Sequence, residues 1–115
     1  YEDRVVLGQL LETFVFQELR RQASGHDAEV CFHHFRDKDG YEVDVVLERD
    51  GRHVAGVEVK AASTVTAADF RGLRKLAAAS GRRFVAGVVL YDGETSASFG
   101  DGLYAVPIRA LWEAR

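Results

Sequence analysis

The sequence contains no methionine, one cysteine and one proline, and each scarcity limits what the chain can be. A single cysteine, Cys31, cannot form an internal disulfide, so the fold does not rest on a disulfide framework. Cys31 lies in an apolar strand pattern, and we expect it to be a small buried residue of a protein in the reducing cytoplasm. No apolar run approaches the roughly 20 residues of a membrane span, and no signal peptide is visible. A chain that lacks methionine and begins at Tyr1 is expected to be a segment of a longer polypeptide.

Familiar motifs are missing as well. No Walker A or Rossmann glycine pattern occurs, and no Gly-x-Ser-x-Gly elbow. The net charge of −3 is unlike that of a stand-alone nucleic-acid-binding protein, which is usually basic. A zinc site at His33 and His34 is disfavoured, because adjacent side chains of a strand face opposite ways. Local basic clusters are explained either as solvated helix ends and turns or as phosphate contacts: Arg20-Arg21, Arg71 with Arg74-Lys75, and Arg82-Arg83.

What remains is an alternating pattern of helices and strands in one domain, residues 1–115. Apolar spacing predicts helices over 4–22 and 67–79, strands over 29–36, 41–48, 52–60, 83–91 and 102–106, and a terminal helix opened by Pro107. The first three strands form an antiparallel meander. The mostly apolar run 83–91 is typical of a strand parallel to its neighbour, reached through a right-handed crossover. The fold class is therefore α/β, with a central mixed sheet flanked by helices.

Two acids and a lysine lie in two of these strands, where inward charges are unusual. Glu58 and Lys60, two residues apart, share a face, and Val57 and Val59 are expected to point into the core. Magnesium commonly takes one or two carboxylates with water and substrate phosphate, so Asp44 and Glu58 are candidate ligands and the carbonyl of Val59 a third. Lys60 would orient or help to deprotonate the attacking water and stabilise charge on the phosphate.

The hairpin register decides whether the two carboxylates meet. If the turn has two residues, Asp44 pairs with Val57 and the acids face opposite sides. If the connection is Asp50-Gly51-Arg52, or if a bulge is present, Asp44 lies opposite Glu58. The apolar pattern favours the three-residue connection, because it places these residues on one face: Val43, Val45, Leu47, Val57 and Val59.

The first predicted helix carries a further acid, Glu12, inside an unusually apolar stretch over residues 10–16. A carboxylate there is costly, which favours a role as an extra metal ligand or in orienting a ligating water. The alternatives stay open at this point. Glu12 would otherwise be a helix-surface glutamate, and Asp44 and Glu58 would lie on the solvated face of the sheet with Lys60 as an ion-pair partner.

In this order the residues resemble the PD-(D/E)XK nuclease superfamily, in the Glu…Asp…Glu-x-Lys form of archaeal Holliday-junction resolvases. Nearly the whole chain is also similar to a family of domains of unknown function at the C-terminus of bacterial and archaeal AAA+-type ATPases. The segments that carry this similarity are Gly8–Val15 with Glu18-Leu19, Phe35–Asp44, Val57–Lys60, Gly72-Leu73, Gly87–Tyr91, Ala105–Ile108 and Leu111-Trp112.

The resemblance implies a restriction-endonuclease-like fold and an ATPase domain upstream in the same polypeptide. It assigns Asp44 and Glu58 as metal ligands, Lys60 as the catalytic lysine and Glu12 as the helix-borne acid, although Val43 replaces the superfamily's usual proline. The implied activity is hydrolysis of DNA phosphodiesters with Mg²⁺, or Mn²⁺ in its place, by an endonuclease or junction-resolving domain.

A different class of function remains open beside the enzyme. The chain would then be a non-catalytic module that binds nucleic acid or protein, or that regulates or dimerises the ATPase. The terminal helix with Leu111 and Trp112 would offer a docking surface, and homo-oligomers fit this hypothesis.

Overall fold

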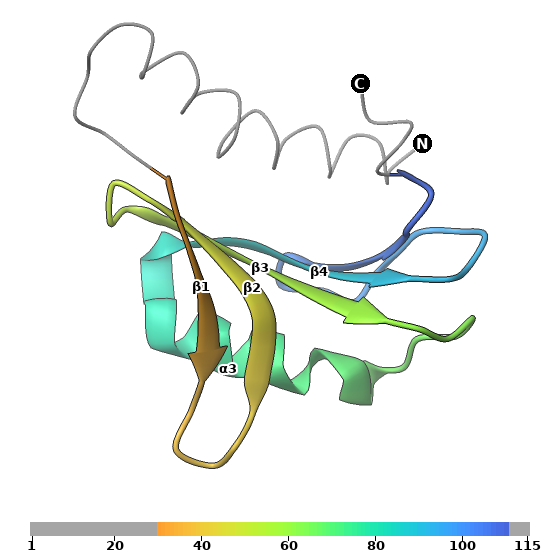
Figure 1. The fold of residues 1–115 in the computed structure, drawn as a ribbon, viewed down its shortest axis with the longest axis horizontal. Coiled ribbons are helices and arrows are strands. Elements are labelled where there is room, and N and C mark those ends of the chain that lie inside the picture. Colours follow the sequence, from red (N-terminus) through yellow and green to blue (C-terminus); the bar gives the residue numbers. More distant parts are fainter. Residues whose placement is uncertain (1–29, 111–115) are drawn as a thin grey trace, which may run out of the picture.

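In the computed structural model, six strands form one mixed sheet in the described part of the chain, residues 30–110 (Figure 1). The predicted helix with Glu12, and Leu111 and Trp112, lie outside the described residues. The strand order across the sheet is β1-β2-β3-β4-β6-β5. The strands are β1 (Val30–Arg36), β2 (Glu42–Arg49), β3 (His53–Lys60), β4 (Phe84–Tyr91), β5 (Ala97–Ser98) and β6 (Leu103–Pro107).

The pairing of the strands confirms the predicted α/β class. β1, β2 and β3 form an antiparallel meander, and β4 runs parallel to both β3 and β6. The short β5, which pairs antiparallel with β6, lies in a stretch predicted to be loop. The terminal helix begins later than predicted: Pro107 is the last residue of β6 and pairs with Tyr91, and the first helical residue after it is Ala110. No helix in residues 30–110 is both long enough and apolar enough to cross a bilayer.

One face of the sheet is covered by the helical segment that connects β3 to β4 (Figure 1). The predicted helix over 67–79 divides into η2 (Ala67–Phe70) and α3 (Arg71–Ser80), followed by η3 (Gly81–Arg83). Phe70, Leu73 and Leu76, at three-residue spacing, are buried against the sheet. Gly81 ends α3 with a φ of 58°, a conformation that a glycine adopts without strain.

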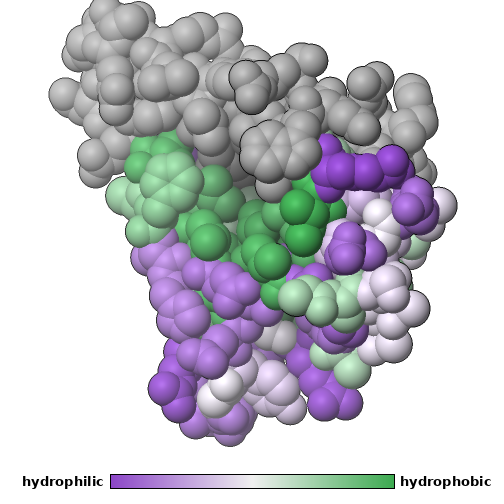
Figure 2. Space-filling view, turned by 45° about the vertical axis from the view of Figure 1, so that its right-hand side comes forward, coloured by the Kyte–Doolittle hydropathy of each residue, from purple (hydrophilic) through white to green (hydrophobic). Residues whose placement is uncertain are grey.

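Apolar side chains pack on both faces of the sheet. The cluster beneath α3 includes Val43, Val46 and Val89, and the cluster on the opposite face includes Val88 and Val106. Not every apolar residue is enclosed, and Figure 2 shows a band of hydrophobic residues on the described surface above a hydrophilic region. Among residues 30–110, the exposed large apolar side chains are Phe32, Val45, Val59 and Val85. Cys31 is exposed too, so the prediction that it is buried is wrong, because it belongs to a strand at the edge of the sheet.

Candidate functional site

The hairpin between β2 and β3 has the three-residue connection that the apolar pattern favours. Arg49 pairs with His53, which leaves residues 50–52 outside the ladder. Asp50 and Gly51 adopt positive φ values of 58° and 68°, and the N–H of Arg52 donates to the carbonyl of Arg49 at 2.9 Å. The ladder reaches Val45 opposite Val57, so the next rung belongs to Asp44 and Glu58. The predicted register is confirmed.

A β-bulge lies at the same point of β2. His33 pairs with Val46 but Phe35 pairs with Val43, so both Asp44 and Val45 oppose one residue of β1. The extra residue brings Val43 and Val46, both fully buried, to the face beneath α3. The prediction that Val43 shares a face with Val45 and Leu47 is therefore wrong, since a bulge interrupts the strict alternation of a strand.

The face predicted for Val57 and Val59 holds for only one of the two residues. Val57 packs partly against the cluster on the face opposite α3. Val59 is 56% exposed, so it does not enter the core as predicted.

The carboxylates of Asp44 and Glu58 join the two strands at this rung. The N–H of Asp44 donates to Oε1 of Glu58 at 2.6 Å, and the N–H of Val59 donates to Oδ2 of Asp44 at 3.0 Å. Side-chain oxygens thus take the place of the carbonyl acceptors of a regular ladder. Each bond uses one oxygen of a carboxylate that offers about four acceptor positions. The pair therefore retains the capacity to bind a cation.

The surroundings of Glu58 disfavour its negative charge. Burial is the main reason that the pKa of Glu58 is raised above its usual value, and the hydrogen bond from Asp44 offsets part of this effect. The charges of Asp44 and Glu42 raise the pKa further, whereas His34 lowers it. Nε2 of His34 lies 3.0 Å from Oε1 of Glu42, so a histidine already sits within this acidic group. A bound cation would relieve the same repulsion.

Lys60 is held by an acid that the sequence analysis did not connect with it. Its Nζ donates to Oδ2 of Asp69 at 2.6 Å, and the N–H of Thr66 donates to the same oxygen at 2.7 Å. The bond from Lys60 is the main reason that the pKa of Asp69 is lowered. The sequence signal was a cap, because Asp69 follows Thr66 by three residues. The contact with Lys60 needs the chain to fold η2 back to the end of β3, which sequence spacing does not show.

A complete metal site is not present among the described residues. In residues 30–110, no group of three or more His, Cys, Asp or Glu side chains is arranged to hold a metal ion. Asp44 and Glu58 meet the minimum of one or two carboxylates that magnesium commonly takes from a protein. The contributions of the Val59 carbonyl and of Glu12, which lies outside the described residues, stay predictions.

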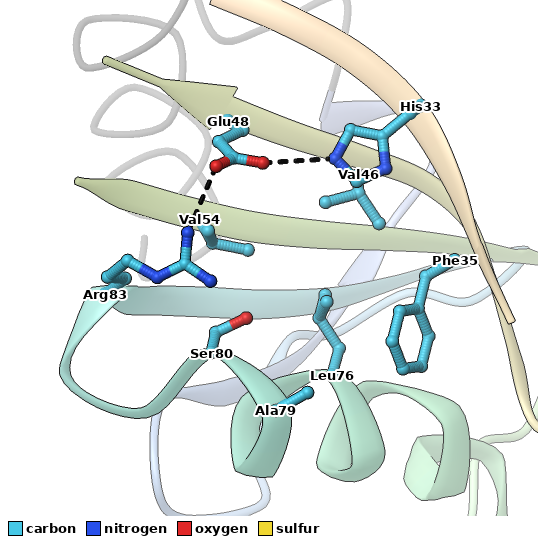
Figure 3. A pocket seen from close by; sticks show the side chains of 9 residues that line it. All are labelled: His33, Phe35, Val46, Glu48, Val54, Leu76, Ala79, Ser80 and Arg83. Carbon is cyan, nitrogen blue, oxygen red and sulfur yellow. Dashed lines mark hydrogen bonds and ion pairs between the residues drawn. The ribbon is translucent and has the colours of Figure 1, made fainter. Parts of the chain in front are cut away.

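A separate pocket of about 140 Å³ lies between α3 and the antiparallel strands (Figure 3). Glu48 links His33 at 3.3 Å with Arg83 at 3.1 Å along its rim. Its remaining lining is mainly apolar and comprises Phe35, Val46, Val54, Leu76, Ala79 and Ser80. None of Asp44, Glu58 or Lys60 lines it, so the pocket is not part of the carboxylate site. His33 and His34 contact different acids, in agreement with the predicted divergence of their rings.

Comparison with known proteins gives one match. No curated protein and no solved structure matches the chain. The family described as "Domain of unknown function (DUF4143)" matches residues 7–111. This confirms the predicted similarity to a family of domains of unknown function, while the nuclease superfamily and an upstream ATPase stay predictions. The chain belongs to the DUF4143 family.

Proposed function

We propose that this domain hydrolyses phosphodiester bonds of DNA with a divalent cation, Mg²⁺ or Mn²⁺, held at Asp44 and Glu58. The observation that carries the proposal is the meeting of these two carboxylates at one rung of β2 and β3, where the pKa of Glu58 is raised. Displaced pKa values of this kind are found at functional sites. The resemblance to the PD-(D/E)XK pattern supports this proposal. The proposal therefore also includes a restriction-endonuclease-like fold and an upstream ATPase domain.

The residues have distinct tasks in this reaction. Asp44 and Glu58 bind and orient the cation, with Val59 and Glu12 as further proposed ligands. A bound cation would supply polarisation of the phosphate and a water molecule of lowered pKa. Lys60 lies two residues after Glu58, and its ammonium would stabilise negative charge that develops on the phosphate. Asp69 restrains Lys60 at the end of β3, so the lysine does not have to be ordered when substrate binds.

The test is cleavage of plasmid, single-stranded and branched DNA with Mg²⁺ or Mn²⁺. We expect Asp44→Asn and Glu58→Gln to lower the rate by about 100-fold or more, because each removes charge from the cation site. Both amides keep an oxygen that can accept the backbone bond, so the strands stay joined. Glu48→Gln is the matched control, since it neutralises a glutamate of β2 that contacts Arg83 and His33 instead. Cleavage that survives Asp44→Asn and Glu58→Gln would refute the assignment.

One observation favours the non-catalytic alternative. Both carboxylates already accept backbone N–H bonds, which is what acids with a purely structural task would do. Calorimetric titration with Mn²⁺ separates the two hypotheses. Binding that is lost in Glu58→Gln and kept in Glu48→Gln supports the metal site. Heat that is absent from the wild type, or unchanged by Glu58→Gln, supports the structural task.

A further inference from the structure

Positive charge is concentrated in the segment that connects β3 to β4. Between Phe70 and Tyr91 the sequence holds no acidic residue. The cations of this segment are Arg71, Arg74, Lys75, Arg82 and Arg83. The acids of the candidate site lie on β2 and β3 instead, so the two kinds of charge occupy different elements.

Three of these cations form a line on the outer side of α3, which we name the α3 ridge: Arg71, Arg74 and Lys75. They follow the spacing i, i+3, i+4, which places them on one face of a helix. All three are exposed, whereas Leu73 and Leu76 face the sheet and are buried. The apolar face of α3 is thus already used by the fold, and the helix cannot insert that face into a membrane.

The ridge cations are only lightly engaged by protein acids. Nη1 of Arg74 lies 3.6 Å from Oδ2 of Asp101, a side chain that is 87% exposed. Nζ of Lys75 lies 3.9 Å from Oδ2 of Asp39, and it also lies 5.2 Å from the centre of the Tyr41 ring. Exposed pairs of this kind are weak. Among residues 30–110, Arg71 makes no ion pair.

The start of the ridge is next to the candidate site. β3 ends at Lys60, and the chain returns beneath the sheet as η2 and α3 (Figure 1). Asp69, which holds Lys60, precedes Arg71 by only two residues. A polyanion that follows the ridge toward the N-terminus of α3 would therefore arrive at Lys60.

We propose that the α3 ridge binds the phosphate backbone of duplex DNA. Its three cations lie within about 6 Å along the helix axis and would neutralise neighbouring phosphates. From Arg71 to Arg83 the sequence has no aromatic residue to stack on an unpaired base, which favours a duplex over a single strand. The choice of DNA rests on the proposed function.

The experiment measures binding of the full chain to a labelled duplex at several salt concentrations without divalent cation, so that no cleavage occurs. Arg71→Gln, Arg74→Gln and Lys75→Gln should each reduce the slope of log affinity against log salt by about 0.9. Each should weaken binding by about threefold to tenfold at low salt. Arg109→Gln is the control, because it removes one exposed positive charge outside the ridge and should leave the slope unchanged.

A gain of affinity provides the complementary measurement. Asp101→Asn and Asp39→Asn release Arg74 and Lys75 from their acidic neighbours, and each should tighten duplex binding by about twofold to threefold. Three results would overturn the proposal. They are equal effects of the ridge variants and of Arg109→Gln, tighter binding of single-stranded DNA or RNA than of the duplex, and displacement of the duplex by polyglutamate at equal charge.

The ridge and the catalytic proposal can fail separately. If the ridge variants weaken duplex binding but the protein cleaves no DNA, DNA binding at the ridge is supported and the nuclease assignment is refuted. If cleavage depends on Asp44 but its KM is unchanged in the ridge variants, DNA binding at the ridge is refuted and the nuclease assignment is supported.

Discussion

Replacing Gly72 provides the sharpest test of how closely α3 packs against the sheet. It lies in the first turn of α3, where the helix backbone approaches β2. A Cβ atom at this position would overlap the carbonyl oxygen of Glu42 and lie 3.0 Å from its carbon. Both atoms belong to the backbone, so the neighbour cannot rotate away as a flexible side chain would. Gly72→Ala is therefore expected to push the start of α3 away from β2.

Two effects of opposite sign decide the outcome of Gly72→Ala. Alanine is favoured over glycine in a helix by at most about 1 kcal/mol. Overpacking against rigid neighbours typically costs about 1–3 kcal/mol, and contact with a backbone carbonyl belongs at the upper end. The net free energy of unfolding should fall by about 2 kcal/mol. For a domain of this size, the Tm should fall by about 8 °C.

Thermal and urea unfolding of Gly72→Ala measure this difference, with Ala78→Gly as the matched control. Ala78 is exposed on the same helix, so its replacement reports the intrinsic preference alone and should cost about 1 kcal/mol. The reasoning is refuted if Gly72→Ala stabilises the protein by as much as Ala78→Gly destabilises it. That result would mean that α3 has room for a methyl group against Glu42.

Two further substitutions change stability with pH in opposite directions. Burial raises the pKa of Glu58, so the contribution of Glu58 to stability is greatest at low pH and is lost as the pH rises through the folded-state pKa. Glu58→Gln should therefore stabilise the metal-free protein at neutral pH and not in acid. Urea unfolding at several pH values measures this difference, and a stabilisation by Glu58→Gln that grew toward acid would contradict the prediction. Lys60 lowers the pKa of Asp69, so that stabilisation is present above the unfolded-state pKa and is lost as the pH falls through the folded-state value. Asp69→Asn should lower the free energy of unfolding by about 1 kcal/mol at neutral pH and leave it unchanged in strong acid. Asp39→Asn is the control, because the pair of Asp39 with Lys75 is exposed, and it should change this free energy by less than about 0.5 kcal/mol. Equal losses of stability in the two variants would show that the Lys60 contact is no stronger than a surface pair.

Local sequence signals were sufficient for five of the six strands and for the meeting of the two carboxylates. The length of the hairpin connection sets which residues oppose one another, and Asp50-Gly51-Arg52 is readable from the turn residues and the flanking apolar pattern. The apolar run over 83–91 likewise indicated a strand parallel to a neighbour, and β4 has two such neighbours, β3 and β6. These features depend on residues close together in the chain.

Features set by partners distant in sequence were not predictable. The bulge at Asp44 and Val45 exists because of how β2 pairs with β1, and no residue in β2 marks it. Cys31 has the surroundings of a buried strand residue, but the position of β1 at the edge of the sheet leaves it exposed. Asp69 carried a visible capping signal, while its contact with Lys60 depends on the path of the chain between β3 and α3.

The exchange of backbone and side-chain partners between Asp44 and Glu58 gives the protein two built-in spectroscopic reporters. The amide protons of Asp44 and Val59 are bonded to the very carboxylates that would turn toward a cation. Loading the site should therefore shift the resonances of these two amides and speed their exchange with solvent, while the amides of the neighbouring Val45–Val57 rung stay protected. The last rung of this hairpin is thus expected to respond to ions while the rest of the sheet does not.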